Sequence, residues 1–212
     1  MAISYNILDL GKVGYHEAWE IQKELQSKRI QGQINDQFLL AEHPPVYTIG
    51  KNAPLEDLLI KEVDDILIIQ TDRGGKITFH GPGQVVGYPI IDLNNHKRSV
   101  SWYMRELEQL IMNVLSDYNI RSQRKKGLTG IWVNDKKIAA LGVRISRWVT
   151  MHGFSLNINP DLSYYKGIVP CGIKDFGVTS MAEILGKKCP KISDIKLKII
   201  KYFTSQFSIG EN

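Results

Sequence analysis

One residue of this 212-residue chain combines a reactive side chain with a setting that would expose it. Cys171 stands between Pro170 and Gly172 in a turn-rich segment, so we expect its thiol to have little cover. A cysteine attacks a carbonyl as its thiolate, the minor form at neutral pH, so a base or a cation must lie nearby. Cys171 is therefore a candidate nucleophile, with a purely structural role as the alternative. Cys189 precedes Pro190 in a lysine-rich loop and is interpreted as structural.

Three other side chains are candidates to activate that thiol: Lys137, His80 and His152. Residues alternate between the faces of a strand, so Lys137 shares a face with Ala139 and Leu141, and burial there would favour its neutral form as a base. The alternative is a lysine that ends a hairpin in solvent. Both histidines are followed by glycine, as a tight pocket would require, but hydrogen-bonded structural histidines have the same signature.

A glycine-rich block at 73–89 could hold a ligand beside these groups. It contains five glycines and two prolines together with Arg73, Thr78, His80 and Gln84, which is more than a structural turn needs. We interpret it as a ligand-holding loop on a β-scaffold. Gly74 and Gly75 could cradle a phosphate through their N–H groups, but the match is short and no P-loop motif is present. No His or Cys spacing suggests a metal site.

Apolar periodicity and turn signals predict the elements that must position these residues. Helices are expected at 15–29, at 99–118 with Ser99 as N-cap, near 178–186 and at 193–207. Strands are expected at 38–41, 46–49, 66–71, 85–91, 131–133, 137–145 and 148–158, with a hairpin turn at 134–135 and an irregular segment at 159–176. Pro89 would place its strand near an edge or at a bend. The pattern predicts an α/β or α+β fold, one domain over 1–212 with a mixed β-sheet flanked by helices.

Composition and charge indicate where the protein acts but do not identify its binding partner. The chain is 43% hydrophobic and 23% charged, shows no signal peptide or membrane span, and has two cysteines, which favours a reducing cytoplasm. Its net charge is +5, with basic clusters at 121–126 and 187–201 that could attract nucleic acid, an anionic membrane or acidic proteins. Neither cluster has the interleaved aromatic residues of a nucleic-acid site.

Three motifs in order give the chain a family resemblance. The first is Arg-Gly-Gly-x-x-Thr-Phe-His-x-x-Gly-Gln-x-Val-x-Tyr, from Arg73 to Tyr88. The second is Lys-Ile-Ala-Ala-Leu-Gly at 137–142 with Thr-Met-His-Gly-Phe-Ser-Leu-Asn at 150–157, and the third is Pro-Cys-Gly at 170–172 with Val-Thr-Ser-Met at 178–181. Together they resemble the bacterial lipoyl(octanoyl)transferases, which belong with the lipoate and biotin protein ligases.

The resemblance implies transfer of an octanoyl or lipoyl group from acyl carrier protein to a lysine of a lipoyl domain. Cys171 would carry the acyl group as a thioester, Lys137 would favour the thiolate and shuttle protons, and neither ATP nor a cofactor would be needed. Main-chain N–H groups near Leu141–Gly142 or Cys171–Gly172 are candidates for the oxyanion hole. Supporting roles would fall to His152, Gln84 and Gly172. The implied substrate wall consists of Arg73, Gly74, Gly75, Lys76, Ile77, Thr78, Phe79, His80, Ala140, Leu141, Gly142, Gly153, Phe154 and Ser155.

The implied partners are octanoyl-acyl carrier protein, the lipoyl domains of 2-oxoacid dehydrogenase complexes and the glycine cleavage H protein, with neither nucleic acid nor membrane. The nearest alternative is an ATP-dependent lipoate or biotin ligase on the same fold. Such an enzyme needs no cysteine, so Pro170-Cys171-Gly172 argues against it. A non-catalytic nucleic-acid-binding domain is the second alternative.

Overall fold

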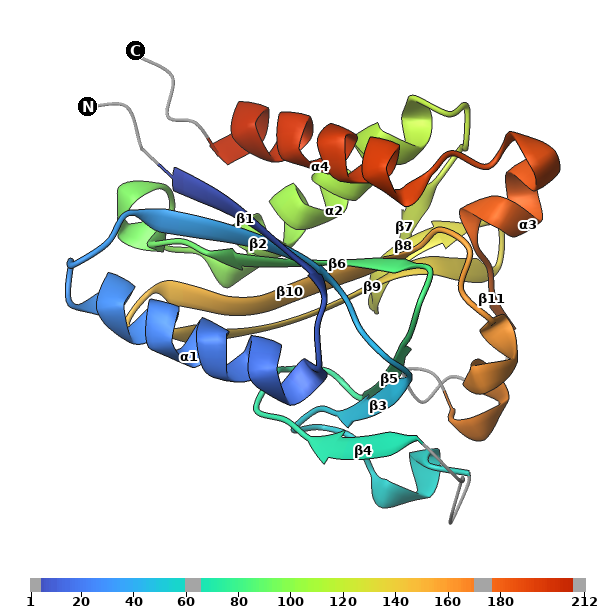
Figure 1. The fold of residues 1–212 in the computed structure, drawn as a ribbon, viewed down its shortest axis with the longest axis horizontal. Coiled ribbons are helices and arrows are strands. Elements are labelled where there is room, and N and C mark those ends of the chain that lie inside the picture. The colour runs from blue at the N-terminus through green and yellow to red at the C-terminus, as the bar shows by residue number, and fades with distance from the viewer. Residues whose placement is uncertain (1–4, 60–65, 170–176, 208–212) are drawn as a thin grey trace.

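The computed structural model describes residues 5–59, 66–169 and 177–207. In these ranges an eight-stranded mixed sheet has the order β1-β2-β6-β10-β9-β8-β7, with β11 paired to β9 (Figure 1). Among the described strands of this sheet, only β1–β2 and β9–β11 are parallel pairs. The strands are β1 (Tyr5–Lys12), β2 (Asp36–Glu42), β6 (Gln84–Ile90), β7 (Gln123–Lys125), β8 (Leu128–Val133), β9 (Lys136–Ser146), β10 (Val149–Asn157) and β11 (Gly177–Val178).

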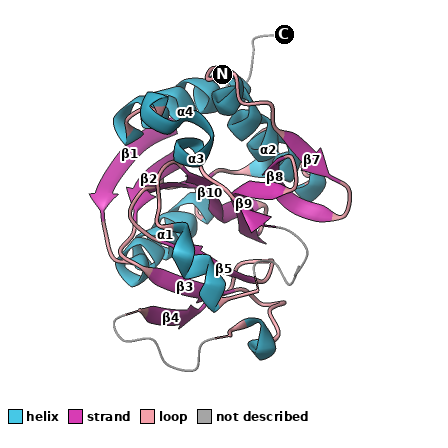
Figure 2. Ribbon diagram, turned by 90° about the vertical axis from the view of Figure 1, so that its right-hand side faces the viewer, coloured by secondary structure: helices cyan, strands magenta, loops and turns pink. Residues whose placement is uncertain are grey.

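Helices cover both faces of this sheet (Figures 1 and 2). α2 (Val100–Ser116) and α4 (Ile192–Phe207) pack together on one face, and α1 (Tyr15–Ile30) lies along β10 on the other. Short helical turns are η1 (Leu55–Asp57), η2 (Leu93–Asn95), η3 (Leu162–Gly167), α3 (Met181–Leu185) and η5 (Gly186–Lys188). Because both faces are covered, every residue of β6 and β10 is buried. Within the described ranges, no helix combines the length and the apolar character needed to cross a membrane.

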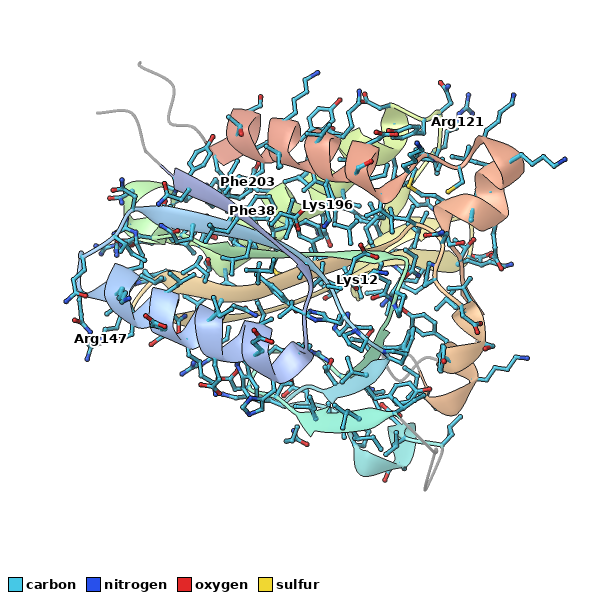
Figure 3. The ribbon with its side chains drawn as sticks, viewed as in Figure 1. Lys12, Phe38, Arg121, Arg147, Lys196 and Phe203 are labelled. Atoms are coloured by element: carbon cyan, nitrogen blue, oxygen red, sulfur yellow. The ribbon has the colours of Figure 1, made fainter. Side chains whose placement is uncertain are left out.

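The main core lies between the sheet and the α2–α4 pair. Phe38 of β2 stacks on Phe203 of α4 with ring centroids 4.0 Å apart (Figure 3). Most of the α2 stripe expected from its periodicity is buried here, from Tyr103 to Leu115, whereas Val100 at the start of the stripe is exposed. Ser99 caps the helix by accepting a hydrogen bond from the Trp102 N–H. An amphipathic helix is held in place mainly by burial of such a stripe.

A second, three-stranded sheet lies below the first in Figure 1, in the order β4-β3-β5. It consists of β3 (Val46–Ile49), β4 (Leu67–Gln70) and β5 (Ile77–His80). Its core is aromatic, since Phe79 stacks on Tyr164 of η3 at 4.7 Å. β5 corrects the loop interpretation of the glycine-rich block, because two strands, β5 and β6, occupy much of that block.

The structure confirms the mixed α/β architecture and most predicted elements, including the hairpin turn, where Asn134 has a φ of +52°. The prediction for Pro89 is wrong in one respect, because β6 is an interior strand. Pro89 is tolerated there since the β6–β10 pairing ends at Gly87, and Gly153 of β10 leaves room for the proline ring. Strands β1, β7 and β11 were not predicted, and the helix expected near 178–186 begins at Met181.

Candidate active site

A cavity of about 410 Å³ lies between the two sheets. This volume falls in the range of about 300–1,000 Å³ typical of small-molecule sites. Its walls come from β5 and the turn before it, from β6, β9 and β10, from the start of β8, and from α1 and α2. Its lining residue Val100 at the N-terminus of α2 is exposed, which indicates an opening there. The lining residues are Tyr15, Arg73, Gly74, Gly75, Lys76, Ile77, Thr78, His80, Val86, Tyr88, Val100, Met104, Gly127, Leu128, Thr129, Lys137, Ala140, Leu141, Gly142, Val143, His152, Gly153, Phe154 and Ser155.

Lys137 lies in the wall of this cavity near the start of β9. Its side chain is buried, whereas Lys136 is exposed, so the solvent-exposed hairpin lysine is excluded. The Lys137 carbonyl accepts a hydrogen bond from the Thr179 N–H at 2.9 Å, and Val178 of β11 pairs with Lys137 in register. The chain that follows residues 170–176 is thus fixed directly to the strand that carries Lys137.

The main chain of β9 beyond Lys137 forms the floor of the cavity. Among the described residues β8 pairs with β9 only as far as Ala139. Ala140 to Gly142 pair with β10 on one side and border the cavity. Farther along, the Gly74 N–H donates to the Val143 carbonyl at 2.9 Å. The amide of Gly74 is therefore engaged within the fold, which weakens the phosphate-cradle interpretation of Gly74–Gly75.

Arg73 brings a buried positive charge to the end of the cavity farther along β9. Its guanidinium donates to the Thr48 carbonyl at 2.6 Å and to the Thr48 hydroxyl at 2.8 Å, so the side chain is held by β3. Burial raises the pKa of the neighbouring Tyr15 to about 12, although the positive charge of Arg73 opposes that shift. Tyr15 is therefore a neutral phenol at physiological pH.

His80 is a neutral side chain with a defined tautomer. The Gln84 amide donates to the Phe79 carbonyl and to the Tyr165 hydroxyl, so the Gln84 Oε1 accepts from the His80 Nδ1 at 3.2 Å and leaves Nε2 as an acceptor. Burial, followed by the repulsion that a protonated His43 and the Arg73 charge would exert, holds the pKa of His80 well below its usual value.

His152 occupies a strained position in the wall opposite β5. Its φ is +60°, in the left-handed region, and its N–H donates to the buried Gln22 side chain of α1 at 2.9 Å. The His152 Nε2 donates to Asp72 at 2.7 Å, and Arg144 pairs with the other Asp72 oxygen at 3.0 Å. Burial lowers the pKa of His152 more than Asp72 raises it, so His152 is neutral too.

Sequence reasoning overlooked a third histidine at this end. His43 donates from Nδ1 to the Val13 carbonyl at 2.8 Å and accepts at Nε2 from the Tyr88 hydroxyl at 2.6 Å. Burial lowers the pKa of His43, and burial raises that of Tyr88 well above its usual value. The one sequence signal for His43 was its position before Pro44 and Pro45 in the connection between two strands, which is weak evidence for a functional residue.

The structure brings most of the predicted wall together and moves one residue out of it. Phe79 does not line the cavity, because β5 alternates and turns the ring into the aromatic core of the second sheet. Gln84 lies behind His80, consistent with a supporting position. Cys171 and Gly172 lie outside the described residues. As contacts to a substrate, the lining residues remain a prediction.

Several lining residues were not predicted: Tyr15, Val86, Tyr88, Val100, Met104, Gly127, Leu128, Thr129 and Val143. Tyr15 and Met104 belong to helical stripes that resemble core positions, so periodicity alone could not single them out. Tyr88 is a fixed position of the first motif, which was the available signal. Within the described ranges, no group of three or more His, Cys, Asp or Glu side chains could hold a metal ion.

Comparison with known proteins agrees with this geometry. The family model described as "Lipoyl protein ligase A/B catalytic domain" matches residues 14–204. An octanoyltransferase of Solibacter usitatus is 52% identical over 179 residues, which cover 82% of this chain and 81% of that protein. The structure of protein Ta0514, a "putative lipoate protein ligase from T. acidophilum", matches with a TM-score of 0.76 at 14% identity, over 96% of this chain and 85% of the other. A biotin protein ligase of Aquifex aeolicus matches with a TM-score of 0.59 at 17% identity, over 95% and 69%. The expected ligase-like catalytic fold is confirmed, and the chain belongs to the lipoyl protein ligase A/B catalytic domain family.

Proposed function

We propose that this protein is an octanoyltransferase, an acyltransferase of protein lipoylation that moves an octanoyl or lipoyl group from acyl carrier protein to a lysine of a lipoyl domain. The relative at 52% identity carries the same activity in its name. The proposal treats the 212 residues as one catalytic domain in the cytoplasm. Its lipoyl-domain substrates would be those of 2-oxoacid dehydrogenase complexes and the glycine cleavage H protein.

In the first half-reaction, the Cys171 thiolate attacks the thioester carbonyl of the acyl carrier. A new S–C bond forms, the carrier's S–C bond breaks, and the carrier's thiolate leaves with a proton from the Lys137 ammonium. In the second, the amine of the target lysine attacks the Cys171 thioester and forms an amide. The departing thiolate stays on Cys171, and Lys137 receives the proton of the amine. Exchange of one thioester for another is nearly isoenergetic and amide formation is downhill, so the cycle needs no ATP.

The observation that carries this proposal is the place of Lys137. It is a buried lysine in the wall of a cavity of small-molecule size, and its main chain is bonded to Thr179. On the other side of residues 170–176, the Val169 N–H donates to the Asp57 carbonyl at 2.7 Å, and Tyr165 lines a small pocket together with Lys137. Cys171 is only two residues from Val169, a reach of about 7 Å of extended chain. Both attachments favour an encounter of Cys171 with Lys137.

The ATP-dependent ligase remains the alternative on the same fold. Its glycine loop would bind the adenylate, whereas here the Gly74 N–H is used by Val143. The decisive experiment incubates the protein with octanoyl-acyl carrier protein in the absence of ATP and measures the intact mass. We expect one octanoyl adduct, which Cys171→Ala abolishes while the fold is retained. An unmodified mass in an actively transferring sample would overturn the thioester route.

Basic side chains at the mouth of the cavity support an acidic carrier as the acyl donor. Lys126 precedes the lining residue Gly127, and Arg98 stands two residues before Val100, which is 48% exposed at the opening. Both cations are exposed and form no ion pair with any described residue. Figure 3 shows Arg121 and Arg147 at opposite ends of the molecule, so the positive charge is not a single patch.

A charge-reversal comparison tests this assignment of the donor surface. The double variant Lys126→Glu/Arg98→Glu should lower kcat/KM for octanoyl-acyl carrier protein roughly tenfold at low salt, and the difference should shrink as salt is raised. The control is Lys187→Glu/Lys191→Glu, which reverses two exposed cations of the C-terminal basic cluster. An equal loss in both double variants would argue against a docking surface at the mouth.

A further inference from the structure

The proposed reaction gives no role to Trp132, a buried indole directly beside Lys137. Trp132 of β8 is the cross-strand partner of Lys137 in the β8–β9 pairing, so the two side chains lie on the same face of the sheet. The Lys137 Nζ lies 4.8 Å from the centre of the indole ring. The ring is 1% exposed. An ammonium within about 6 Å of an indole face is attracted by the ring quadrupole, and more strongly where water is excluded.

The backbone at this point is irregular in a way that re-aims the lysine. Ile131 pairs with Ala139, but the next residue, Trp132, pairs with Lys137, so β9 contains one extra residue at this step. Such a bulge bends the strand, increases its twist and changes the direction of the side chains it carries. The bulge and the indole thus act on the same side chain.

Gly130, two residues before Trp132, provides the space for the stem of Lys137. A Cβ atom at Gly130 would lie 3.1 Å from the Lys137 Cε and 2.7 Å from the Ala139 carbonyl oxygen. The φ of Gly130 is +123°, a conformation that L side chains rarely adopt. The aliphatic part of the Lys137 side chain therefore packs against the main chain at Gly130, and its ammonium lies beside the Trp132 indole.

A second ammonium shares the same ring. The Lys125 Nζ lies 5.0 Å from the Trp132 ring centre and forms an ion pair with Asp135 at 2.6 Å. Lys125 is not among the lining residues of the cavity, whereas Lys137 is. The charge of Lys125 is paired with the Asp135 carboxylate, which is not among the lining residues. Of the two ammonium groups beside this ring, that of Lys137 is therefore the one at the cavity.

We propose that Trp132 is a positioning residue of the transfer reaction, whose indole face holds the Lys137 ammonium in the orientation needed to stabilise the Cys171 thiolate. This inference rests on the proposed function, because it assumes that Lys137 acts on Cys171. Loss of the ring should raise the pH at which Cys171 becomes reactive, because a displaced ammonium stabilises the thiolate less well. It should lower kcat and leave KM for the acyl carrier unchanged, since Trp132 is buried and is not among the lining residues of the cavity.

The test measures the rate of Cys171 alkylation against pH, together with kcat and KM, in Trp132→Leu and Trp132→Phe. Trp132→Leu should move the midpoint of the alkylation profile upward by about half a pH unit to one unit and lower kcat about five- to tenfold. Trp132→Phe keeps an aromatic face and should recover most of the shift. The matched control is Trp102→Leu, which removes a partly buried indole from α2 and should leave the midpoint unchanged. Equal shifts in the Leu and Phe variants at Trp132 would overturn the proposal, because they would indicate packing alone.

A double-mutant cycle separates this inference from the proposed function. If the ring acts through the lysine, Trp132→Leu adds no further shift to a chain that already carries Lys137→Met. If Lys137→Met itself leaves the alkylation profile unchanged, the proposed dyad is wrong and the role of Trp132 falls with it. If Lys137→Met shifts the profile but Trp132→Leu does not, the dyad stands and only the positioning role is refuted. Thermal unfolding of each variant confirms that the comparison is made on folded protein.

Discussion

Substitution of Gly142 by alanine tests whether the far wall of the cavity is as tightly built as the structure indicates. Gly142 pairs with Gly153 across β9 and β10. A Cβ atom at Gly142 would lie 2.8 Å from the Gly74 carbonyl oxygen and 3.3 Å from the Arg73 Cδ. Ordinary contacts of a Cβ begin at 3.4 Å, so the turn that contains Gly74 must retreat by about 0.6 Å.

That retreat is opposed by specific bonds. Arg73 is fixed to Thr48 by two hydrogen bonds, and the Gly74 N–H is bonded to the Val143 carbonyl. Overpacking of this kind typically costs about 1–3 kcal/mol. For a domain of this size each kcal/mol lowers Tm by about 2–4 °C, so we expect a decrease of roughly 2–12 °C. The acyl-transfer rate should fall as well, because Arg73 and Gly74 both line the cavity.

Alanine substitutions at two further glycines give an upper and a lower reference for the loss of stability expected of Gly142→Ala. A Cβ at Gly153 would collide with the Gly87 carbonyl oxygen and lie 2.8 Å from the Pro89 Cδ, both within the sheet, so Gly153→Ala should lose more stability than Gly142→Ala. Gly14 precedes α1 with a φ of −58° and has open space around its Cβ position, so Gly14→Ala should lose less than about 1 kcal/mol. Thermal unfolding ranks the three variants. A Gly142→Ala protein that melts and reacts like the parent would refute the reasoning.

Two other predictions concern the buried histidines. Burial lowers the pKa of His43, His80 and His152 below the usual 6.5. Below pH 6.5 the unfolded chain therefore binds more protons than the folded protein does. The contribution of these neutral rings to the free energy of unfolding is complete above pH 6.5 and decreases as the pH is lowered from there. Each histidine changes the free energy of unfolding by up to about 1.4 kcal/mol per pH unit, so the urea midpoints at pH 5.5 and pH 7.5 should differ clearly. Equal midpoints would contradict the assignment of neutral histidines. Asp72→Asn removes the carboxylate that raises the pKa of His152, so NMR titration should place the His152 pKa still lower in that variant; an unchanged or higher value would show that the Asp72 contact is not formed in solution.

The sequence predicts the helices and strands that have a clear hydrophobic periodicity or turn signal, and it does not predict those in which that pattern is weak. The stripe of α2 and the Asn134–Asp135 hairpin follow from periodicity and turn chemistry, and both are confirmed. β5 was taken for loop because glycines flank it on both sides, although its four residues are buried. β1 is a half-exposed edge strand with charged residues, which weakens alternation. Such strands are specified by their partners, not by their own sequence.

The site follows the same division. The sequence left open whether Lys137 was buried or in solvent, and the bulge between Lys137 and Ala139 interrupts the alternation along β9 that was expected there. Alternation applied to β5 would have separated Phe79 from the lining residues Thr78 and His80. That rule was available only once β5 was known to be a strand. The contact of Lys137 with Thr179 joins two separate motifs, so tertiary structure alone reveals it. The pairing of Lys137 with Trp132 lies across the predicted turn at 134–135, so the hairpin was a signal from which it could have been found.

The hydrogen bonds of the histidines also decide which groups can move a proton. Partner groups force a donor on one ring nitrogen of His43, His80 and His152, and the low pKa of each ring leaves its other nitrogen as an acceptor. A ring that is hard to protonate cannot serve as the acid for a departing thiolate. Arg73 can donate hydrogen bonds near a developing negative charge, but its guanidinium does not give up its proton. Lys76, the other lysine in the cavity wall, is partly exposed and pairs with Asp57 at 4.0 Å. We therefore propose that the buried Lys137 carries the proton between the two half-reactions, and that the buried histidines shape the wall in which the acyl chain would lie.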